Sequence, residues 1–410
     1  MTPVSPKSRI SLVTLLLAAD FAVLPTSVVA GPAGTDTRNY IARAESGGHW
    51  FVKTYSPGTD LAKAEDAAAL SEHARLRGVP VAPALYTAND NRLVARHPWL
   101  SMSVTRFIPR TVTADGRLTG RRWEAVGEAV GRLHRGFARH GFARSGVGTH
   151  GVARQGMGRH GFGPPLLGPR DRSVDVARSR TRLEELLSWY EAAPPVTAFD
   201  RWAVATAHEK LARLPEVERL LEKVPQAMVS QLVHGDLSGP NVLLKGDEVA
   251  ALIDFAPPVR RSPVWELGRL ALDPRTVLTR PDWPDGLSRL AAAYHHRHPV
   301  VGVRELVSVV RLTAAALALS VYPLNTVAAG LGPVTPSLAA YARARHQAAA
   351  VLRERLDEAE ERVRDRLGQS RRPRRSSASR PRPFRQPVGT PSNRLSTPWP
   401  RRPPLAHRTS

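Results

Sequence analysis

Residues 231–255 read QLVHGDLSGPNVLLKGDEVAALIDF, and the fold that we expect for this chain rests on them. Two short, largely apolar runs, residues 231–233 and 249–253, are typical of buried strands. Each run is followed by an acidic residue, Asp236 after the first and Asp254 after the second. Turn-forming Ser, Gly, Pro and Asp residues reverse the chain between the runs. We therefore expect one small sheet that carries both acids at its edge.

Two further polar residues, His234 and Asn241, lie in the same stretch, and Asn241 comes just before another apolar run at 242–244. Phosphoryl transfer needs one carboxylate to take the proton of an attacking hydroxyl. It also needs an amide oxygen and a second carboxylate to hold magnesium against the phosphates. Asp236, Asn241 and Asp254 supply this set, so the stretch predicts a phosphoryl-transfer site. An isolated His-Gly-Asp would instead indicate ordinary loop sequence.

His234-Gly235-Asp236 followed by Asn241, and then Ile253-Asp254-Phe255, resembles the paired signature of the aminoglycoside phosphotransferase / choline kinase family. The resemblance implies that Asp236 is the catalytic aspartate and that His234 is a structural histidine. It also implies that Asn241 and Asp254 are the metal ligands. Glu266 fits the family's acidic position on a following helix, where Asp is commoner.

The resemblance implies an α+β, bilobal protein-kinase-like fold, with a small β-rich N-lobe that has one main helix and a larger, mostly helical C-lobe. We predict the N-lobe over residues 20–109 and the C-lobe over residues 110–368, after an N-terminal extension of residues 1–19. The implied activity is transfer of the γ-phosphoryl group of ATP, with Mg²⁺, to a hydroxyl of a small molecule. An aminoglycoside-like compound, an amino alcohol or a similar metabolite would be the acceptor.

The N-terminal part contains the residues expected to bind ATP. A turn with Gly31 and Gly34 follows a strand predicted at residues 21–24. Glycines in such a turn let backbone N–H groups approach a phosphate, and a plain hairpin is the alternative. Lys53 lies in a strand-like run, and the resemblance implies that it reaches the α- and β-phosphates. A surface lysine on an edge strand is the alternative.

Glu65 lies near the start of a predicted helix over residues 61–77. We expect its carboxylate to pair with Lys53 and to hold the lysine in the phosphate site. Asp66 and Glu72 on the same helix are the alternative partners.

The first thirty residues share features with a secretory signal, because basic residues precede an apolar run at 10–19 and Val28-Val29-Ala30 would suit cleavage. However, Asp20 interrupts the apolar stretch, and cleavage after Ala30 would remove the first predicted strand. The run is also far shorter than the roughly 20 residues that span a bilayer. We therefore expect a retained N-terminus, no membrane insertion and a cytoplasmic enzyme.

Apolar periodicity predicts the helices of the C-lobe. They are expected over residues 123–137, 177–190, 199–214, 216–224, 265–272, 287–297, 304–319 and 337–367. His134 on the first of them is expected to be a packed structural histidine. No motif identifies the acceptor. Asp282 and Asp285 would suit ammonium groups, whereas Trp265, Trp283 and Tyr294 would suit a quaternary amine; ordinary core or surface positions are the alternative for both sets.

Charge and composition change sharply at the C-terminus. The net charge of the chain is +23, and residues 369–410 contain eleven arginines and no acidic residue, which leaves +12 for the rest. Nine prolines and few apolar residues in this segment predict a disordered basic tail. A tail that contacts nucleic acid or an acidic surface is the alternative.

Residues 136–168 break the helical pattern, since His-Gly recurs every ten residues at His140, His150 and His160. Such a short repeat predicts a flexible insert. The chain has no cysteine, which excludes disulfides, thiolate metal sites and a cysteine nucleophile. Two other functions stay open: a catalytically silent, kinase-like nucleotide-binding protein, and a protein that binds through its basic tail.

Overall fold

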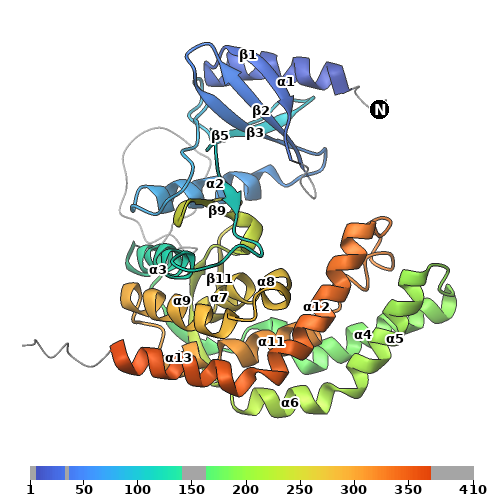
Figure 1. Ribbon diagram of the computed structural model, residues 1–410. Coiled ribbons are helices and arrows are strands. Elements are labelled where there is room, and N and C mark those ends of the chain that lie inside the picture. Colours follow the sequence, from blue (N-terminus) through green and yellow to red (C-terminus); the bar gives the residue numbers. More distant parts are fainter. Residues whose placement is uncertain (1–5, 33–36, 141–162, 371–410) are drawn as a thin grey trace, which may run out of the picture. The chain divides into compact units, whose positions relative to one another are not determined.

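The computed structural model describes residues 6–32, 37–140 and 163–370, which all belong to the unit Met1–Arg371. Its N-terminal part is a five-stranded antiparallel sheet in the order β1-β2-β3-β5-β4 (Figure 1). These strands are β1 (Pro25–Ala30), β2 (Thr37–Ala44), β3 (His49–Tyr55), β4 (Val94–Ala95) and β5 (Ser101–Arg106). A single long helix, α2 (Leu61–Arg75), connects β3 to β4.

An N-terminal helix, α1 (Pro6–Phe21), packs against this sheet beside β1 (Figure 1). Leu16, Leu17 and Phe21 are buried in one apolar cluster with strand residues such as Val52. The strand predicted at residues 21–24 is therefore wrong, because the first strand begins at Pro25 and the apolar run before it is helical. This run belongs to the core of the N-terminal part rather than to a separate extension.

Asp20, the polar residue that interrupts the apolar run, has a defined role at the end of α1. Its carboxylate accepts a hydrogen bond from His97 Nε2 at 2.7 Å, and its backbone carbonyl accepts one from Ala88 N. These bonds tie the helix to the segment around β4. No helix in the described part of the chain is long and apolar enough to cross a membrane.

Two separate three-stranded antiparallel sheets follow, instead of the single small sheet that the sequence predicted. One has the order β10-β9-β6 and consists of β6 (Val112–Thr113), β9 (Val242–Lys245) and β10 (Glu248–Leu252). The other has the order β11-β8-β7 and consists of β7 (Leu166–Pro169), β8 (Ala227–Val233) and β11 (Val259–Arg261). The two acid-bearing loops therefore come from different sheets, which loop–loop hydrogen bonds hold together.

Helices surround these sheets. Helix α3 (Arg122–His140) packs closely on α9 (Trp283–Arg297), where Gly286 allows the contact. A Cβ at Gly286 would lie 2.1 Å from the Trp123 ring, so no larger residue fits there without movement. Helix α13 (Leu356–Ser370) covers the other side of α9 (Figure 1).

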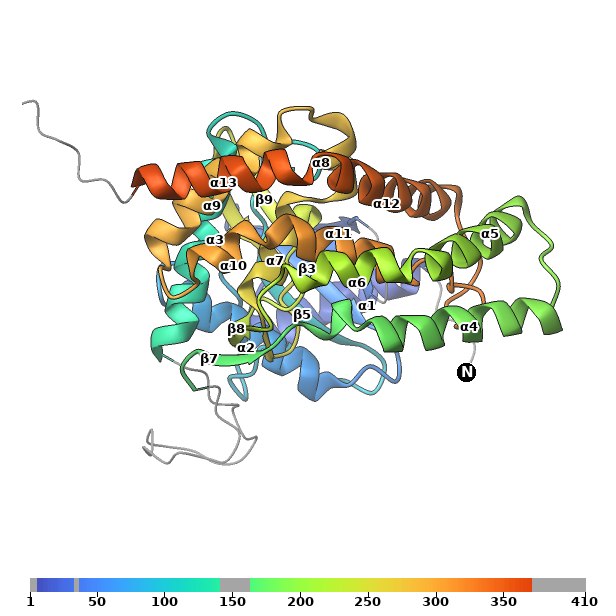
Figure 2. The ribbon, with the colours of Figure 1, turned by 90° about the horizontal axis from the view of Figure 1, so that it is seen from below.

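The remaining helices belong to the helical part, and several of them lie nearest the viewer in Figure 2, which looks from the side away from the N-terminal sheet. They are α4 (Val176–Ala192), α5 (Ala198–Ala212), α6 (Leu214–Glu222), α7 (Pro263–Ala271), α8 (Pro274–Thr279), α10 (Val303–Val307), α11 (Val309–Leu319) and α12 (Pro336–Glu354). The helices predicted over 304–319 and 337–367 are each two helices, separated at Ser308 and Arg355. The mixed α+β class with a β-rich first part and a helical second part is confirmed.

The insert predicted over residues 136–168 is wrong at both ends, because helix α3 continues to His140 and Leu166–Pro169 form strand β7. Its centre, residues 141–162, lies outside the described residues, as does the predicted tail from residue 371 onward.

A buried polar network connects the end of α9 to strand β8. His298 Nε2 donates to Gln231 Oε1 at 3.0 Å, and Gln231 Nε2 donates to the carbonyl of His134 at 3.0 Å. Burial, together with the positive charge of Arg135, lowers the pKa of His298 to about 3. The imidazole is therefore neutral in the folded protein over most of the acidic range.

This pKa predicts acid sensitivity. The unfolded chain protonates His298 near pH 6.5, but the folded chain does not. The contribution of His298 to stability is therefore fully present above that pH and is lost as the pH falls toward 3. Between pH 7.5 and 5.0 we expect His298 alone to cost about 2 kcal/mol of unfolding free energy.

Urea denaturation at the two pH values measures this cost. His298→Asn should lower stability at neutral pH but should flatten the loss on acidification. His208→Asn, a change of an exposed histidine on α5, is the matched control and should keep the wild-type slope. If His298→Asn lost as much unfolding free energy between pH 7.5 and 5.0 as the wild type, the low pKa of His298 would be contradicted.

Candidate active site

The loop after β8 carries His234, Gly235 and Asp236. Gly235 has φ +88°, and a Cβ there would lie 2.6 Å from the Cβ of Ala256. Only glycine combines this backbone conformation with so close an approach. The loop is thereby pressed against the segment that follows Asp254, and the Asp236 side chain emerges half exposed.

His234 joins the two acid-bearing loops from the inside. Its Nε2 donates to the carbonyl of Ile253 at 3.0 Å, its Nδ1 accepts from the N–H of Asp236 at 3.3 Å, and its ring stacks on Phe255 at 4.1 Å. Burial lowers the pKa of His234, which keeps the imidazole neutral with its proton on Nε2. The ring thus holds the loops of two different sheets in one geometry.

Glu266 anchors the same loop from helix α7. Its fully buried carboxylate accepts hydrogen bonds from the N–H groups of His234 (3.1 Å) and Gly235 (2.6 Å) and from His134 Nε2 (3.0 Å). Burial alone would raise the pKa of Glu266, but these hydrogen bonds and the neighbouring imidazoles hold it below its usual value. The carboxylate is therefore a fixed anion, and His134 is the packed histidine that the sequence predicted.

Arg269, which the sequence analysis missed, contacts Asp236 directly. Its Nη2 lies 2.9 Å from Asp236 Oδ1, while Asn241 Nδ2 donates to the backbone carbonyl of Asp236 at 2.8 Å and lies 3.3 Å from Oδ2. Arg269 follows Glu266 by three positions on α7, so both side chains face the loop. That spacing from the acidic position is the one sequence signal that pointed to it.

Asn241 and Asp254 lie on neighbouring loops joined by a backbone hydrogen bond from Ile253 N to the Asn241 carbonyl at 3.0 Å. The Asn241 amide nitrogen is used by Asp236, which leaves Oδ1 without a hydrogen bond among the described residues. Asp254 adopts a left-handed backbone, φ +63°, and presents a half-exposed carboxylate. Two neighbouring loops thus each carry a side chain with a hard oxygen donor.

These donors suit a cation that also binds phosphates. In the described residues no group of three or more His, Cys, Asp or Glu is arranged to hold a metal by itself. Mg²⁺ does not need such a group when a nucleotide is present, because one or two carboxylates and the substrate phosphates suffice. The residues at this position therefore fit a metal–nucleotide complex better than a permanent metal.

Lys53 comes to this site from strand β3. Val52 and Thr54 point into the N-terminal core, so Lys53 points away from it, and its Nζ lies 2.5 Å from Asp254 Oδ1. The pair joins residues 201 positions apart in the chain. A cation and an anion from distant parts of the chain are thus in direct contact at this site.

The predicted pair between Lys53 and Glu65 does not form. The Glu65 carboxylate instead accepts hydrogen bonds from the N–H groups of Leu93 (2.7 Å) and Val94 (3.2 Å), which connects α2 to β4. The alternative partner Glu72 pairs with Arg75. The expectation was wrong because the unpaired N–H groups at β4 offer Glu65 nearby donors, while Lys53 reaches Asp254.

The glycine turn between β1 and β2 is only partly described. Gly31 N donates to the carbonyl of Asn39 at 2.8 Å, and Asn39 Nδ2 donates to the carbonyl of Pro32 at 2.8 Å. Gly34 lies outside the described residues. Gly31 thus closes the base of the turn, and its N–H is used by the hairpin itself.

The residues considered for the acceptor do not assemble. Trp283 and Tyr294 are fully buried in the core, and Asp285 pairs with Arg289 and Arg366. Trp265 faces a cavity, but the guanidinium groups of Arg261 and Arg269 lie 3.3 and 4.9 Å from the centre of its ring. A quaternary amine would have to displace these cations.

Comparison with solved structures shows the same fold. Spectinomycin phosphotransferase in complex with ADP and spectinomycin matches with a TM-score of 0.51 and 15% identity, covering 89% of this chain and 100% of that one. An aminoglycoside phosphotransferase from Alicyclobacillus acidocaldarius matches with a TM-score of 0.52 and 16% identity, covering 89% and 98%.

A third similar structure is amicoumacin kinase in complex with AMP-PNP, Ca²⁺ and its substrate, with a TM-score of 0.52, 15% identity and coverage of 83% and 93%. Identities this low establish the fold alone. No curated protein matches the sequence significantly.

The sequence itself matches the profile of the phosphotransferase enzyme family over residues 27–307. This span is more than half of the chain, and it includes the N-terminal sheet with Lys53 and the loops that carry Asp236, Asn241 and Asp254. The chain therefore belongs to the phosphotransferase enzyme family.

Proposed function

We propose that this protein is a small-molecule kinase that transfers the γ-phosphoryl group of ATP to a hydroxyl of its acceptor. The observation that supports this most directly is the convergence of Asp236, Asn241 and Asp254, from two sheets, with Lys53 from a third. The similar proteins complexed with ADP, or with AMP-PNP and Ca²⁺, support a nucleotide and a divalent cation as cofactors. Dependence on ATP favours a cytoplasmic location.

Each residue has a distinct task in this proposal. Asp236 accepts the hydrogen bond of the acceptor hydroxyl and takes its proton, while Arg269 and Asn241 orient the carboxylate. Asp254 and Asn241 Oδ1 hold Mg²⁺, and Lys53 binds phosphate oxygens. When bound, the cation offsets the negative charge that builds up on the phosphates.

The same site argues against a silent nucleotide-binding protein. A protein that only bound ATP would have no need of an oriented, half-exposed carboxylate such as Asp236 next to the metal ligands. A function that depends on the basic tail is separable, since removal of residues 371–410 should leave ATP turnover nearly unchanged.

The metal assignment is tested by nucleotide binding. Calorimetric titration with ATP, with and without MgCl₂, should show that Mg²⁺ tightens binding to the wild type. Asp254→Asn should remove most of that gain, about tenfold or more, because it removes the charged ligand. Asn241→Ala should act in the same direction with a smaller effect.

Asp247→Asn provides the matched control. Asp247 lies in the turn of the same β9–β10 hairpin, is exposed, and pairs only with Arg122 among the described residues. It should keep the full magnesium effect. An Asp254→Asn variant with an undiminished magnesium effect would overturn the assignment.

A further inference from the structure

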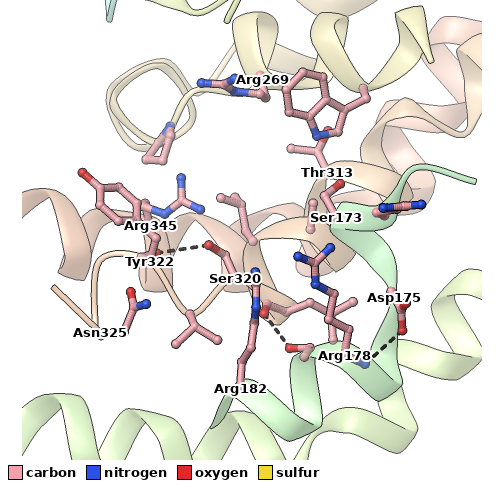
Figure 3. A pocket seen from close by; sticks show the side chains of 18 of the residues that line it. Ser173, Asp175, Arg178, Arg182, Arg269, Thr313, Ser320, Tyr322, Asn325 and Arg345 are labelled. Carbon is pink, nitrogen blue, oxygen red and sulfur yellow. Dashed lines mark hydrogen bonds between the residues drawn. The ribbon is translucent and has the colours of Figure 1, made fainter. Parts of the chain in front are cut away.

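A cavity of about 670 Å³ opens beside the catalytic loop (Figure 3). It lies among α4, α7, α11 and α12, and Ser238, Trp265 and Arg269 form the part of its wall next to the loop. Arg269 lines the cavity and also contacts Asp236, so one side chain connects the cavity wall to the proposed base. Its volume suits a small organic ligand.

The charges on the cavity wall are unbalanced. Five arginines line it, namely Arg172, Arg178, Arg182, Arg269 and Arg345, against the acids Asp175, Glu185 and Asp273. Two of the acids are engaged elsewhere: Asp273 is buried against Arg275, and Asp175 caps helix α4. The wall therefore has an excess of positive charge.

Four of the arginines have no acidic partner. Within the described ranges, no ion pair or side-chain hydrogen bond is formed by Arg172, Arg178, Arg182 or Arg345. Figure 3 shows Arg178 and Arg182, one turn apart on α4, extending toward the middle of the cavity, with Arg345 reaching in from α12. Arg178 and Arg182 are exposed and Arg345 is half-buried. Unpaired guanidinium groups gathered on one wall attract an anion, and each can form bidentate hydrogen bonds to it.

Neutral polar atoms on the wall also lack partners. Ser173 Oγ and Asn325 Oδ1 are both buried, and neither has a hydrogen bond within the part of the chain that the structure describes. Buried polar atoms are normally hydrogen-bonded, so these two are exceptions among the residues that line the cavity. Apolar residues, including Leu186, Leu317 and Val321, form part of the rest of the wall.

We propose that the acceptor of this kinase is an anionic alcohol: a compound whose carboxylate or phosphate group binds Arg178, Arg182 and Arg345 while its hydroxyl faces Asp236. This inference rests on the proposed function and adds the substrate class. Bidentate guanidinium contacts suit both anionic groups. A polycationic acceptor would meet repulsion on the same wall.

In the proposed phosphoryl transfer, one bond forms and one bond breaks at the γ-phosphorus. The acceptor oxygen forms a bond to the γ-phosphorus, and the bond from that phosphorus to the β–γ bridging oxygen breaks. ADP leaves with the electron pair, and the hydroxyl proton passes to Asp236 and then to solvent. The anionic group of the acceptor takes no part in these bond changes and only positions the hydroxyl.

Four probes of one shape separate charge from size. They are 4-(hydroxymethyl)benzoate, its neutral primary amide, 4-(hydroxymethyl)benzylamine, and 4-(hydroxymethyl)phenyl phosphate. Dissociation constants for the full-length protein come from ligand-observed NMR titration. We expect at least one anionic probe to bind about tenfold more tightly than the amide; comparison of the benzoate with the phosphate ester identifies the preferred group. Equal binding of all probes, tighter binding of the amine, or no binding of either anion would overturn the proposal.

Single substitutions on α4 test the residues. Arg178→Gln and Arg182→Gln should each weaken binding of the anionic probe by about tenfold and leave binding of the neutral amide unchanged. Arg180→Gln on the same helix is the matched control: it removes the same charge at an exposed position off the cavity wall and should have no effect. If Arg178→Gln and Arg182→Gln bound the anionic probe as tightly as Arg180→Gln does, the assignment would be contradicted.

The same preparations distinguish this inference from the proposed function. ATP-dependent phosphorylation of the amine but not of the anions would sink the anionic-acceptor proposal and leave the kinase intact. Preferential anion binding by a protein that neither binds ATP with Mg²⁺ nor forms ADP would support the cavity assignment and reject the kinase.

Discussion

Replacing Asp236 by Asn is expected to lower phosphoryl transfer by a factor of about 10²–10⁴ while leaving the affinity for ATP with Mg²⁺ unchanged. The substitution removes the proton acceptor and the charge that Arg269 holds at 2.9 Å. It preserves the shape of the side chain and leaves the proposed metal ligands in place. Rate and nucleotide affinity should therefore separate.

The rate is measured as ADP release, with an acceptor or as slow hydrolysis in its absence, and calorimetry gives the affinity for ATP. Arg269→Gln is the companion variant, because it leaves the carboxylate but removes its orienting cation. We expect it to lose less rate than Asp236→Asn and to shift the pH profile of the reaction. Normal turnover by Asp236→Asn would remove the role proposed for this residue.

Replacing Glu266 by Gln is expected to lower the free energy of unfolding by about 3–5 kcal/mol, the range for breaking a buried charged network. The carboxylate accepts three hydrogen bonds, from two backbone N–H groups and His134. A Gln side chain has one acceptor oxygen and places an NH₂ group against another donor. The catalytic loop should loosen along with the core, so turnover should fall too.

Urea denaturation monitored by fluorescence measures the loss. Glu128→Gln is the matched control, since Glu128 forms a partly exposed ion pair with Arg297 and should cost about 1 kcal/mol or less. Glu266→Asp keeps the charge but shortens its reach, and should lie between the two. A Glu266→Gln protein as stable as the control would show that the loop does not depend on this carboxylate.

The sequence by itself determined the family and the α+β class, because residues 231–255 encode both local elements and chemistry. Strands β8, β9 and β10 lie close to where the apolar runs placed them. The acids follow the strands, so the loops that carry them were predictable from short-range pattern alone. The position of Glu266 followed from the family resemblance, but its three hydrogen bonds did not.

Only the tertiary structure decided which side chains meet. The sequence favoured a retained N-terminal extension over a signal, but only the tertiary structure showed that the apolar run in α1 packs against the N-terminal sheet as part of a core. Lys53 reaches Asp254 across 201 positions, and Asp236 meets Arg269 across 33, whereas the expected partner Glu65 found backbone donors closer at hand. The arginine-lined cavity likewise combines α4, α7 and α12. Local periodicity defines an element and its buried face, but a partner depends on how elements far apart in the chain pack together.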